Sequence, residues 1–263
     1  MRSLRVRYAL PFFTKVVFTC PVCGGSSEFE YRNRYTRLDR CTECGHVYAR
    51  KQPRAAILNL MYNGFQYWLQ DKVHKGITEI KYGPEWDGFL KARMDILQDT
   101  GVLSHDSKYK VFEVGCSEGM LLRELTRHGH EASGCEMNRC IAEQGKKELN
   151  VDIVALPFEK MSVPQDTYDL VVSFHTLEHL RDVVDAFTKV AHMLKPKGSV
   201  LVEVPSGKEE YETTDHLHFF SEESLRRLVD RFFEETRIVH NSYENAQGVT
   251  IGSLYAIGRH PRS

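Results

Sequence analysis

The stretch V-F-E-V-G-C-S-E-G at residues 111–119 constrains the fold of this 263-residue chain more than any other. An apolar run that contains one acid, Glu113, enters a turn with glycines at positions 115 and 119, and a helical pattern follows at once. Gly115 and Gly119 have no Cβ, so the backbone can turn sharply there and come close to a ligand. The free N–H groups of the next helix would face that ligand. The stretch therefore predicts a strand, a tight turn and a helix at the carboxyl edge of a parallel sheet.

The expected ligand of this turn carries a nucleoside. Glu136 ends the next apolar run, and an acid there can accept two hydrogen bonds from a ribose diol. A dinucleotide fingerprint needs glycine where this chain has Ser117 and Met120. Glu118 at the turn would also repel a pyrophosphate. A phosphate-free ligand with a positive sulfonium fits better, and a tight turn that binds no ligand is the alternative.

The rest of the chain continues to alternate between strand and helix patterns. We expect strands at residues 132–135, 151–154, 168–174 and 199–204, with closing strands at 232–239 and 250–257. We expect helices at 55–75, 84–100, 139–148 and 182–194, and one that begins after Ser221. Asn138 and Ser221 are the predicted N-caps. Because Ser224 stands where a capping box has glutamate or glutamine, no reciprocal box is expected.

Three further motifs give this pattern a family resemblance. Y-D-L-V-V-S at 168–173, L-E-H at 177–179 and L-K-P-K-G at 194–198 join the glycine turn and Glu136. In combination, over about residues 109–257, they resemble the class I S-adenosylmethionine-dependent methyltransferases. The resemblance implies an α/β fold: a seven-stranded Rossmann-like sheet with helices on both faces and an antiparallel final strand. It also implies that S-adenosylmethionine contacts Glu113, Gly115, Cys116, Ser117, Gly119, Glu136, Met137, Leu156, Phe174 and His175.

The residues after the fourth and fifth strands face the acceptor in such a fold. The candidates are His175, Glu178, His179, His216 and His218, and we assign catalytic roles to His175, His179 and His216. A general base would help if the acceptor is a hydroxyl or an acidic carbon. His175, Glu178 and His179 match the inverted zinc-protease motif H-x-x-E-H. We reject that interpretation, because the motif requires a long helix and this run directly follows a buried strand. Similar E-x-x-E-H runs in quinone O-methyltransferases can hold a divalent cation. Three roles therefore stay open for these side chains: general base, metal ligand and hydrogen-bonded anchor of the loop.

Two C-x-x-C pairs precede this domain. Cys20 and Cys23 are followed after 17 residues by Cys41 and Cys44, which is a strong zinc signal. Four sulfurs would complete the tetrahedron, so the Zn²⁺ is expected to be structural. Two disulfides are the alternative, but the other three cysteines stand singly, as in a reducing cytosol. A module this small depends on such a metal for its folding.

The expected organisation is a zinc-binding module at 1–52, a helical lid or substrate segment at 53–104, and a cofactor-binding methyltransferase domain at 105–263. The composition is ordinary for a soluble protein, with 41% hydrophobic residues and a net charge of −1. No apolar run is long enough for a membrane span. The basic N-terminus has no secretory cleavage site and runs into a strand-like segment. We therefore expect a cytoplasmic protein without a membrane partner, and nothing indicates its oligomeric state.

A four-cysteine module ahead of such a domain resembles bacterial methyltransferases of sugar and surface-polysaccharide pathways. We therefore expect methylation of a small molecule, such as a sugar or another secondary metabolite. The alternative is an RNA base methyltransferase that grips RNA with its basic module, since residues 1–54 have a formal charge of +7. The pI near 6.9 and the few aromatic residues among the arginines speak against RNA. A non-catalytic scaffold is a third reading, against which Gly115, Gly119 and Glu136 argue.

Overall fold

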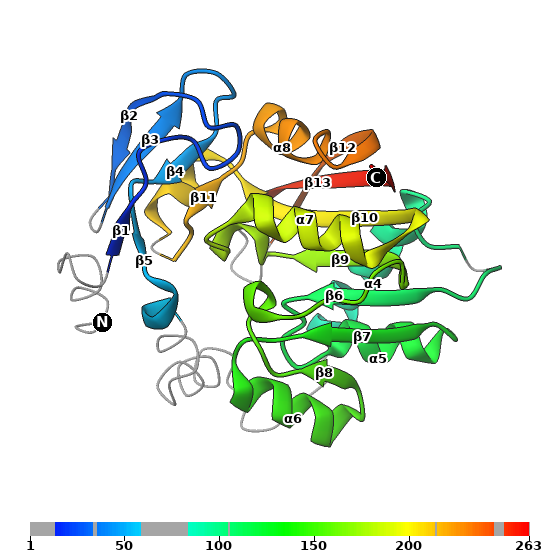
Figure 1. Ribbon diagram of the computed structural model, residues 1–263. Helices are drawn as coiled ribbons and strands as arrows, with labels where there is room; N and C mark the ends of the chain where they lie inside the picture. Colours follow the sequence, from blue (N-terminus) through cyan, green and yellow to red (C-terminus); the bar gives the residue numbers. More distant parts are fainter. Residues whose placement is uncertain are drawn as a thin grey trace.

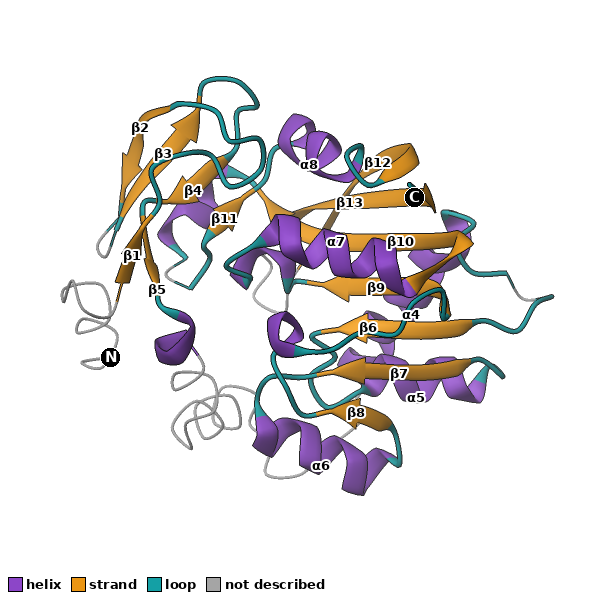
Figure 2. Cartoon of the chain, viewed as in Figure 1, coloured by secondary structure: helices purple, strands orange, loops and turns teal. Residues whose placement is uncertain are grey.

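The computed structural model describes residues 14–33, 36–58, 84–104, 106–213, 215–244 and 250–262. Within these residues the strands form a seven-stranded sheet, a four-stranded sheet and a two-stranded ribbon (Figures 1 and 2). Residues 55–58 are helical, as predicted. The remainder of the predicted helix 55–75, with its aromatic residues, lies outside the described residues.

The central sheet has the predicted Rossmann-like topology. Its described strands run in the order β12-β13-β10-β9-β6-β7-β8, and β13 is antiparallel to both of its neighbours. The five strands from β10 to β8 are parallel. The bounds are β6 (Lys110–Val114), β7 (Glu131–Cys135), β8 (Asp152–Val154), β9 (Tyr168–Phe174), β10 (Leu194–Ser206), β12 (Phe233–Glu244) and β13 (Thr250–Pro261).

Helices cover both faces of this sheet, because the parallel strands bury their residues on both sides. Leu170 and Val172 of β9 pack with α4 (Pro84–Asp99) and α5 (Met120–Arg127), while Val171 packs with α7 (Val183–Met193) and α8 (Glu222–Val229). α6 (Arg139–Leu149) packs beside α5 and β8. Figure 1 shows α7 across the front of the sheet and α4 behind it. None of the helices in the described ranges combines the length and apolarity needed to cross a membrane.

The N-caps follow the sequence prediction with one correction. Asn138 Oδ1 accepts a hydrogen bond from the Ile141 amide at 3.1 Å. Ser221 Oγ accepts from the Ser224 amide at 3.2 Å, and Ser224 Oγ accepts from the Ser221 amide at 2.9 Å. The expectation that no reciprocal box forms was therefore wrong. A serine hydroxyl at the third helical position can reach the cap amide in place of a longer glutamate or glutamine.

Several element ends differ from the prediction. The fifth strand, expected at 199–204, begins at Leu194, with a register irregularity between Leu194 and Ser199. The L-K-P-K-G motif is thus the irregular start of a strand rather than the end of a helix. Helix α7 begins after Asp182, whose carboxylate accepts from the Asp185 amide at 2.9 Å. The closing strands β12 and β13 are also longer than predicted, because each pairs with the other over its whole length.

The N-terminal residues form a small sheet beside the central domain. Its strands are β2 (Ser27–Arg32), β3 (Arg37–Cys41) and β4 (Val47–Ala49). The fourth strand is β11 (His218–Phe219), which lies almost 170 residues later in the sequence (Figure 1). β1 (Thr14–Val16) pairs with β5 (Lys51–Pro53). Three short 3-10 turns complete the described elements: η1 (Phe158–Lys160), η2 (Leu177–His179) and η3 (Lys208–Glu212).

Candidate active site and metal centre

A cavity of about 720 Å³ lies at the carboxyl ends of β6, β7 and β9. Pockets of this size hold drug-sized ligands, so it has room for a nucleoside and a small acceptor. The residues that follow the three strands form one part of its wall: Gly115, Cys116, Ser117, Glu118, Glu136, Met137, Phe174, His175 and Thr176. The N-terminal residues Lys15, Val17, Thr19, Pro21 and Gln52 form another part. Two regions that are distant in sequence therefore enclose the same space.

The turn after β6 depends on its two glycines. Gly115 has φ +76°, and a Cβ there would lie 2.2 Å from Thr176 Oγ1. Gly119 has φ +80° and caps α5, and a Cβ there would lie 2.8 Å from a methyl group of Val151. Ser117 between them also adopts a left-handed φ of +50°. The backbone can therefore pass close to a ligand only because both glycines lack a side chain.

Glu136 lies in the cavity wall at the end of β7. Its Oε2 accepts a hydrogen bond from the Ser117 amide at 3.1 Å, and its Oε1 accepts from the Asn138 amide at 2.7 Å. Burial raises the pKa of Glu136, although the backbone amides oppose that rise. Each carboxylate oxygen can accept more than one hydrogen bond. The side chain is thus fixed in place and retains capacity for the ribose diol predicted to bind there.

Glu113 lies behind the turn, where it is 1% exposed and outside the cavity wall. Arg93 Nη1 lies 3.7 Å from its Oε1. The Arg93 guanidinium also lies 4.4 Å from the centre of the Phe174 ring, and Arg93 reaches the cavity. Burial raises the pKa of Glu113 to about 7 even though Arg93 lowers it. Arg93 was not among the predicted site residues; its signal was an arginine next to Met94 on the apolar face of the predicted helix.

The loop after β8 contains one of the predicted cofactor contacts, Leu156. Leu156 is 46% exposed and is not part of the cavity wall. The next residues, Pro157 and Phe158, do line the cavity. Asp152 begins β8 and so stands at the end of the strand away from the cavity. Residues of the loop after β8 are therefore better placed than Asp152 for contact with a base.

Glu178 is at the centre of the acceptor-side cluster and is 1% exposed. The three histidines proposed as catalytic surround its carboxylate: His175 Nδ1 at 3.6 Å, His179 Nε2 at 3.9 Å and His216 Nε2 at 4.0 Å. Burial raises the pKa of Glu178, but the imidazoles, His175 first, outweigh it and hold the pKa below its ordinary value. The structure thus brings together side chains from η2 and from the segment before β11.

His175 lies between two buried carboxylates at the tip of β9, with φ +50°. Its Nε2 is 3.2 Å from Glu203 Oε1, and that oxygen also accepts a hydrogen bond from Tyr255 Oη at 2.8 Å. Burial lowers the pKa of His175, but Glu178 and Glu203 outweigh burial and raise it to about 9. His175 therefore carries a proton at neutral pH. The sequence analysis did not identify Glu203, which ends up here because β10 pairs with β9.

His179 and His216 differ from His175. His179 Nδ1 is 3.1 Å from the Asp215 carbonyl oxygen, which can only accept, so Nδ1 carries the hydrogen and neutral His179 has its lone pair on Nε2. His216 packs edge-on against His179, with ring centres 4.8 Å apart. Burial, helped by His179, lowers the pKa of His216 to about 4. The ligand atoms of Glu178, His179 and His216 lie within 4.8 Å of one another, so base, cation ligand and anchor remain candidate roles.

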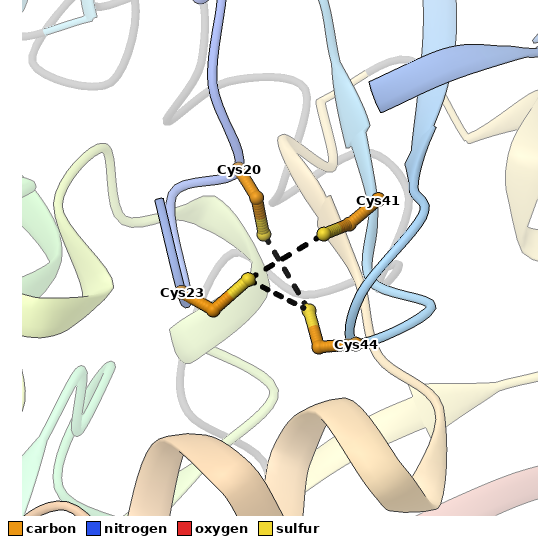
Figure 3. A group of neighbouring side chains, drawn as sticks. All are labelled: Cys20, Cys23, Cys41 and Cys44. Atoms are coloured by element: carbon orange, nitrogen blue, oxygen red, sulfur yellow. Dashed lines mark hydrogen bonds between the residues drawn. The ribbon is translucent and has the colours of Figure 1, made fainter. Parts of the chain in front are cut away.

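The four cysteines of the N-terminal module converge on one point (Figure 3). The Sγ–Sγ distances are 3.6 Å for Cys20–Cys44, 3.4 Å for Cys23–Cys41 and 3.5 Å for Cys23–Cys44. These distances exclude disulfides, whose sulfurs lie about 2.05 Å apart. A tetrahedral zinc with bonds of about 2.3 Å would separate its sulfurs by about 3.8 Å. The cluster therefore fits the predicted Zn²⁺.

Each C-x-x-C pair forms a tight knuckle. Gly24 and Gly45, which follow the pairs, have φ of +79° and +70°. The Glu43 amide donates to Cys41 Sγ at 3.4 Å. Burial raises the pKa of the Cys20 thiol to about 12, so a thiolate there requires a cation beside it. The local geometry is therefore compatible with a bound metal.

Comparisons with known proteins agree with this geometry. Residues 86–232 match the family described as a methyltransferase domain. A ubiquinone biosynthesis O-methyltransferase of Rhizobium leguminosarum bv. trifolii is 31% identical over 98 residues, which are 35% of this chain and 39% of that protein. The enzyme of the same name from Bartonella bacilliformis is 24% identical over 129 residues, 46% of this chain and 52% of that protein. The matches thus span about half or less of these relatives.

Solved structures show the same fold. The N-methyltransferase NodS from Bradyrhizobium japonicum, in complex with S-adenosylhomocysteine, matches with a TM-score of 0.52 and 17% identity, over 65% of this chain and 87% of that one. A phosphoethanolamine N-methyltransferase of Haemonchus contortus matches with a TM-score of 0.58 and 13% identity, over 81% of this chain and 62% of that one. The family match covers more than half of the sequence. The chain therefore belongs to the methyltransferase-domain family, and its central domain is an S-adenosylmethionine-dependent methyltransferase domain, as the motifs predicted.

Proposed function

We propose that this protein transfers a methyl group from S-adenosylmethionine to a hydroxyl of a small, polar acceptor such as a sugar or another secondary or surface-polysaccharide metabolite. The observation that carries the proposal is that Glu136 and His179 line the same cavity. Glu136 would hold the ribose of the cofactor, and His179 would accept a proton from the acceptor. A cofactor and an acceptor bound at these two places would meet inside the cavity, away from bulk water.

The cofactor half of the cavity suits a positively charged nucleoside. Glu118 and Glu136 supply negative charge beside the turn, and Ser117 Oγ donates to Glu118 Oε2 at 2.5 Å. These acids would repel a pyrophosphate and attract a sulfonium. The bound cofactor supplies an electrophilic methyl group. The turn, Glu136 and Met137 then serve to hold and orient the nucleoside, and Arg93 at the same wall is a candidate partner for a carboxylate.

The acceptor half offers a general base. Nε2 of neutral His179 can accept the hydroxyl proton, while the Asp215 carbonyl holds Nδ1 and fixes the tautomer. The buried Glu178 carboxylate would stabilise the imidazolium that forms. His175 already carries a proton between Glu178 and Glu203. We therefore assign it the role of holding these two carboxylates in position, and not that of removing the acceptor proton.

The chemistry of the acceptor wall supports a polyhydroxylated substrate. The cavity wall offers both hydrogen-bond donors and acceptors, from Lys15, Thr19, Arg181, Asp182 and Asp215. O-methylation is the reaction named for the ubiquinone biosynthesis relatives. The four-cysteine module would be a structural zinc site that forms part of this wall. We propose a cytoplasmic location for such an enzyme.

Methyl-labelled S-adenosylmethionine tests the proposal directly. The protein is incubated with the labelled cofactor and either nucleotide sugars or a whole-cell extract that contains RNA, and we expect label in an acid-soluble small molecule. His179→Gln should lower that transfer by about 10²–10⁴-fold without changing cofactor affinity. His128→Gln, at an exposed histidine after α5, is the matched control. Absence of cofactor binding by calorimetry, or label confined to RNA, would contradict the proposal.

A further inference from the structure

We propose that the four-cysteine module is a positioning element of the active site, which holds residues 215–219 against Glu178 and His179. The inference rests on the proposed function only in giving His179 a catalytic role. It concerns a segment of the methyltransferase domain that the module binds as a fourth strand. Three sets of contacts carry the inference: the first and third connect the module with this segment, and the second connects the segment with Glu178 and His179.

The first set is a strand pairing. β11 pairs with β4 in an antiparallel register, with His218 opposite Tyr48 and Phe219 opposite Val47. The Ala49 amide adds a hydrogen bond to the Leu217 carbonyl at 2.9 Å. Figure 1 shows β11 completing the small sheet rather than the central one. The backbone path of residues 217–219 is therefore set by the module.

The second set connects the same segment to η2, the turn that carries Glu178 and His179. The Leu217 amide donates to the Glu178 carbonyl at 2.8 Å, so Leu217 bonds to the module through its oxygen and to η2 through its nitrogen. Two residues earlier, the Asp215 carbonyl accepts from His179 Nδ1. His216 lies between them and faces the Glu178 carboxylate. A shift of this segment would change the tautomer of His179 and the surroundings of Glu178 together.

The third set begins at the cysteine knuckle. His46 follows the Cys44-Gly45 dipeptide and is 0% exposed. Its Nε2 lies 3.1 Å from His218 Nδ1, and the two rings stack with their centres 5.3 Å apart. The His46 carbonyl accepts from the Cys41 amide at 2.8 Å, which holds His46 to the knuckle. Loss of the metal would loosen His46 and, through it, His218.

The cofactor side is held by other contacts. Glu136 bonds to Ser117 and Asn138, both within the central domain. Loosening the module should therefore disturb the acceptor side while cofactor affinity is largely kept. Acceptor-side and cofactor-side effects can therefore be measured separately, without an acceptor substrate.

The test compares Cys23→Ser with Cys140→Ser, a matched cysteine exposed on α6 and outside the cluster. The measurements are zinc content, ¹⁵N imidazole shifts of His179, hydrogen exchange of the Leu217 amide, and S-adenosylhomocysteine affinity by calorimetry. In Cys23→Ser we expect loss of zinc, a changed His179 tautomer signal and Leu217 exchange faster by at least about tenfold. Affinity should stay within about twofold. Unchanged His179 and Leu217 signals in zinc-free protein would overturn the proposal.

A second variant decides the case in which Cys23→Ser unfolds the whole chain. His46→Phe keeps a ring to stack on Tyr48 and His218 but removes the Nε2 contact, and the cysteines remain. We expect bound zinc, with Leu217 exchange faster by about threefold or more and an altered His179 signal. Exchange and signal equal to wild type would overturn the proposal. None of these measurements requires methyl transfer, so failure here is distinct from failure of the proposed function.

Discussion

The backbone amide of Ser117 donates a hydrogen bond to Glu136 Oε2 at 3.1 Å. This bond connects the glycine turn after β6 with the acid that follows β7. The bond fixes the position of the acid relative to the turn, where the proposed ribose would bind. Little ordering remains to be done on binding, and affinity benefits from such preorganisation.

Replacing Glu136 should therefore weaken cofactor binding strongly. Glu136→Gln keeps the size of the side chain but removes the charge and one acceptor, and hydrogen bonds to charged groups contribute about 1.5–3 kcal/mol each. We expect S-adenosylmethionine affinity to fall by about 10- to 100-fold in isothermal calorimetry. Glu143→Gln, on the exposed face of α6, is the control and should bind normally. Equal affinity for both variants would show that Glu136 does not hold the ribose.

Gly115→Ala should cost more than Gly129→Ala, although both glycines have positive φ. A Cβ at Gly129, with φ +87°, meets nothing within 4 Å, so that variant carries backbone strain alone, about 1–2 kcal/mol. At Gly115 the Cβ would also collide with Thr176. We expect a further loss of unfolding free energy, and weaker cofactor binding in Gly115→Ala but not in Gly129→Ala. Thermal unfolding and calorimetry measure both effects, and parallel behaviour of the two variants would contradict the prediction.

The protonated His175 should make stability fall at alkaline pH. Its pKa rises from 6.5 to about 9 on folding, so its contribution is fully present below pH 6.5 and is lost as the pH rises through 9. That rise corresponds to up to about 3 kcal/mol. Glu178 and Glu203 have lowered pKa values, so their contribution is lost at the acid end, as the pH falls below 4.5.

Urea unfolding at pH 6.5 and pH 9.5 measures this effect. The stability difference between wild type and His175→Gln should shrink by up to about 3 kcal/mol between the two pH values. His128→Gln, at an exposed histidine, should follow the wild type. A difference that does not change with pH would mean that His175 is neutral in the folded protein.

The cysteine cluster should bind one zinc ion per chain. Titration of the thiols with a mercurial should release one equivalent, detected with a metallochromic dye. Cys41→Ser should lose the zinc and lower the melting temperature by about 10 °C, because a ligand present at a thousand times its Kd stabilises by about 4 kcal/mol. Cys140→Ser should keep both zinc and melting temperature. A purified protein free of zinc with an unchanged melting temperature would contradict the assignment.

The strands and caps of the central domain were predictable because their signals are local. Tyr168–Phe174 was predicted with its observed bounds, since a continuous apolar run fits a strand buried on both faces. Asn138 was identified as a cap from its position before an apolar-periodic segment. The Ser221–Ser224 box was missed because the rule used for it considered glutamate and glutamine alone.

The acceptor side was only partly predictable, because it is built from contacts distant in sequence. The histidines were found as chemistry-bearing residues near strand ends. Glu203, Asp215 and Arg93 were not found, since nothing in their own neighbourhoods shows that they meet His175, His179 and Glu113. The cysteine spacing predicted a converging cluster, but gave no sign that β11 would complete its sheet.

The pairing of β4 with β11 has a consequence for how such a protein could be re-engineered. A cassette swap that exchanged only the segment before residue 54 would pair the incoming sheet with the β11 of another protein and would replace Ala49, whose amide donates to Leu217. A working chimera would have to carry two separate stretches of sequence, the cysteine-rich one and the segment around His218. The small sheet is thus built from two separate segments of the sequence, and a single junction in the sequence cannot separate it from the central domain.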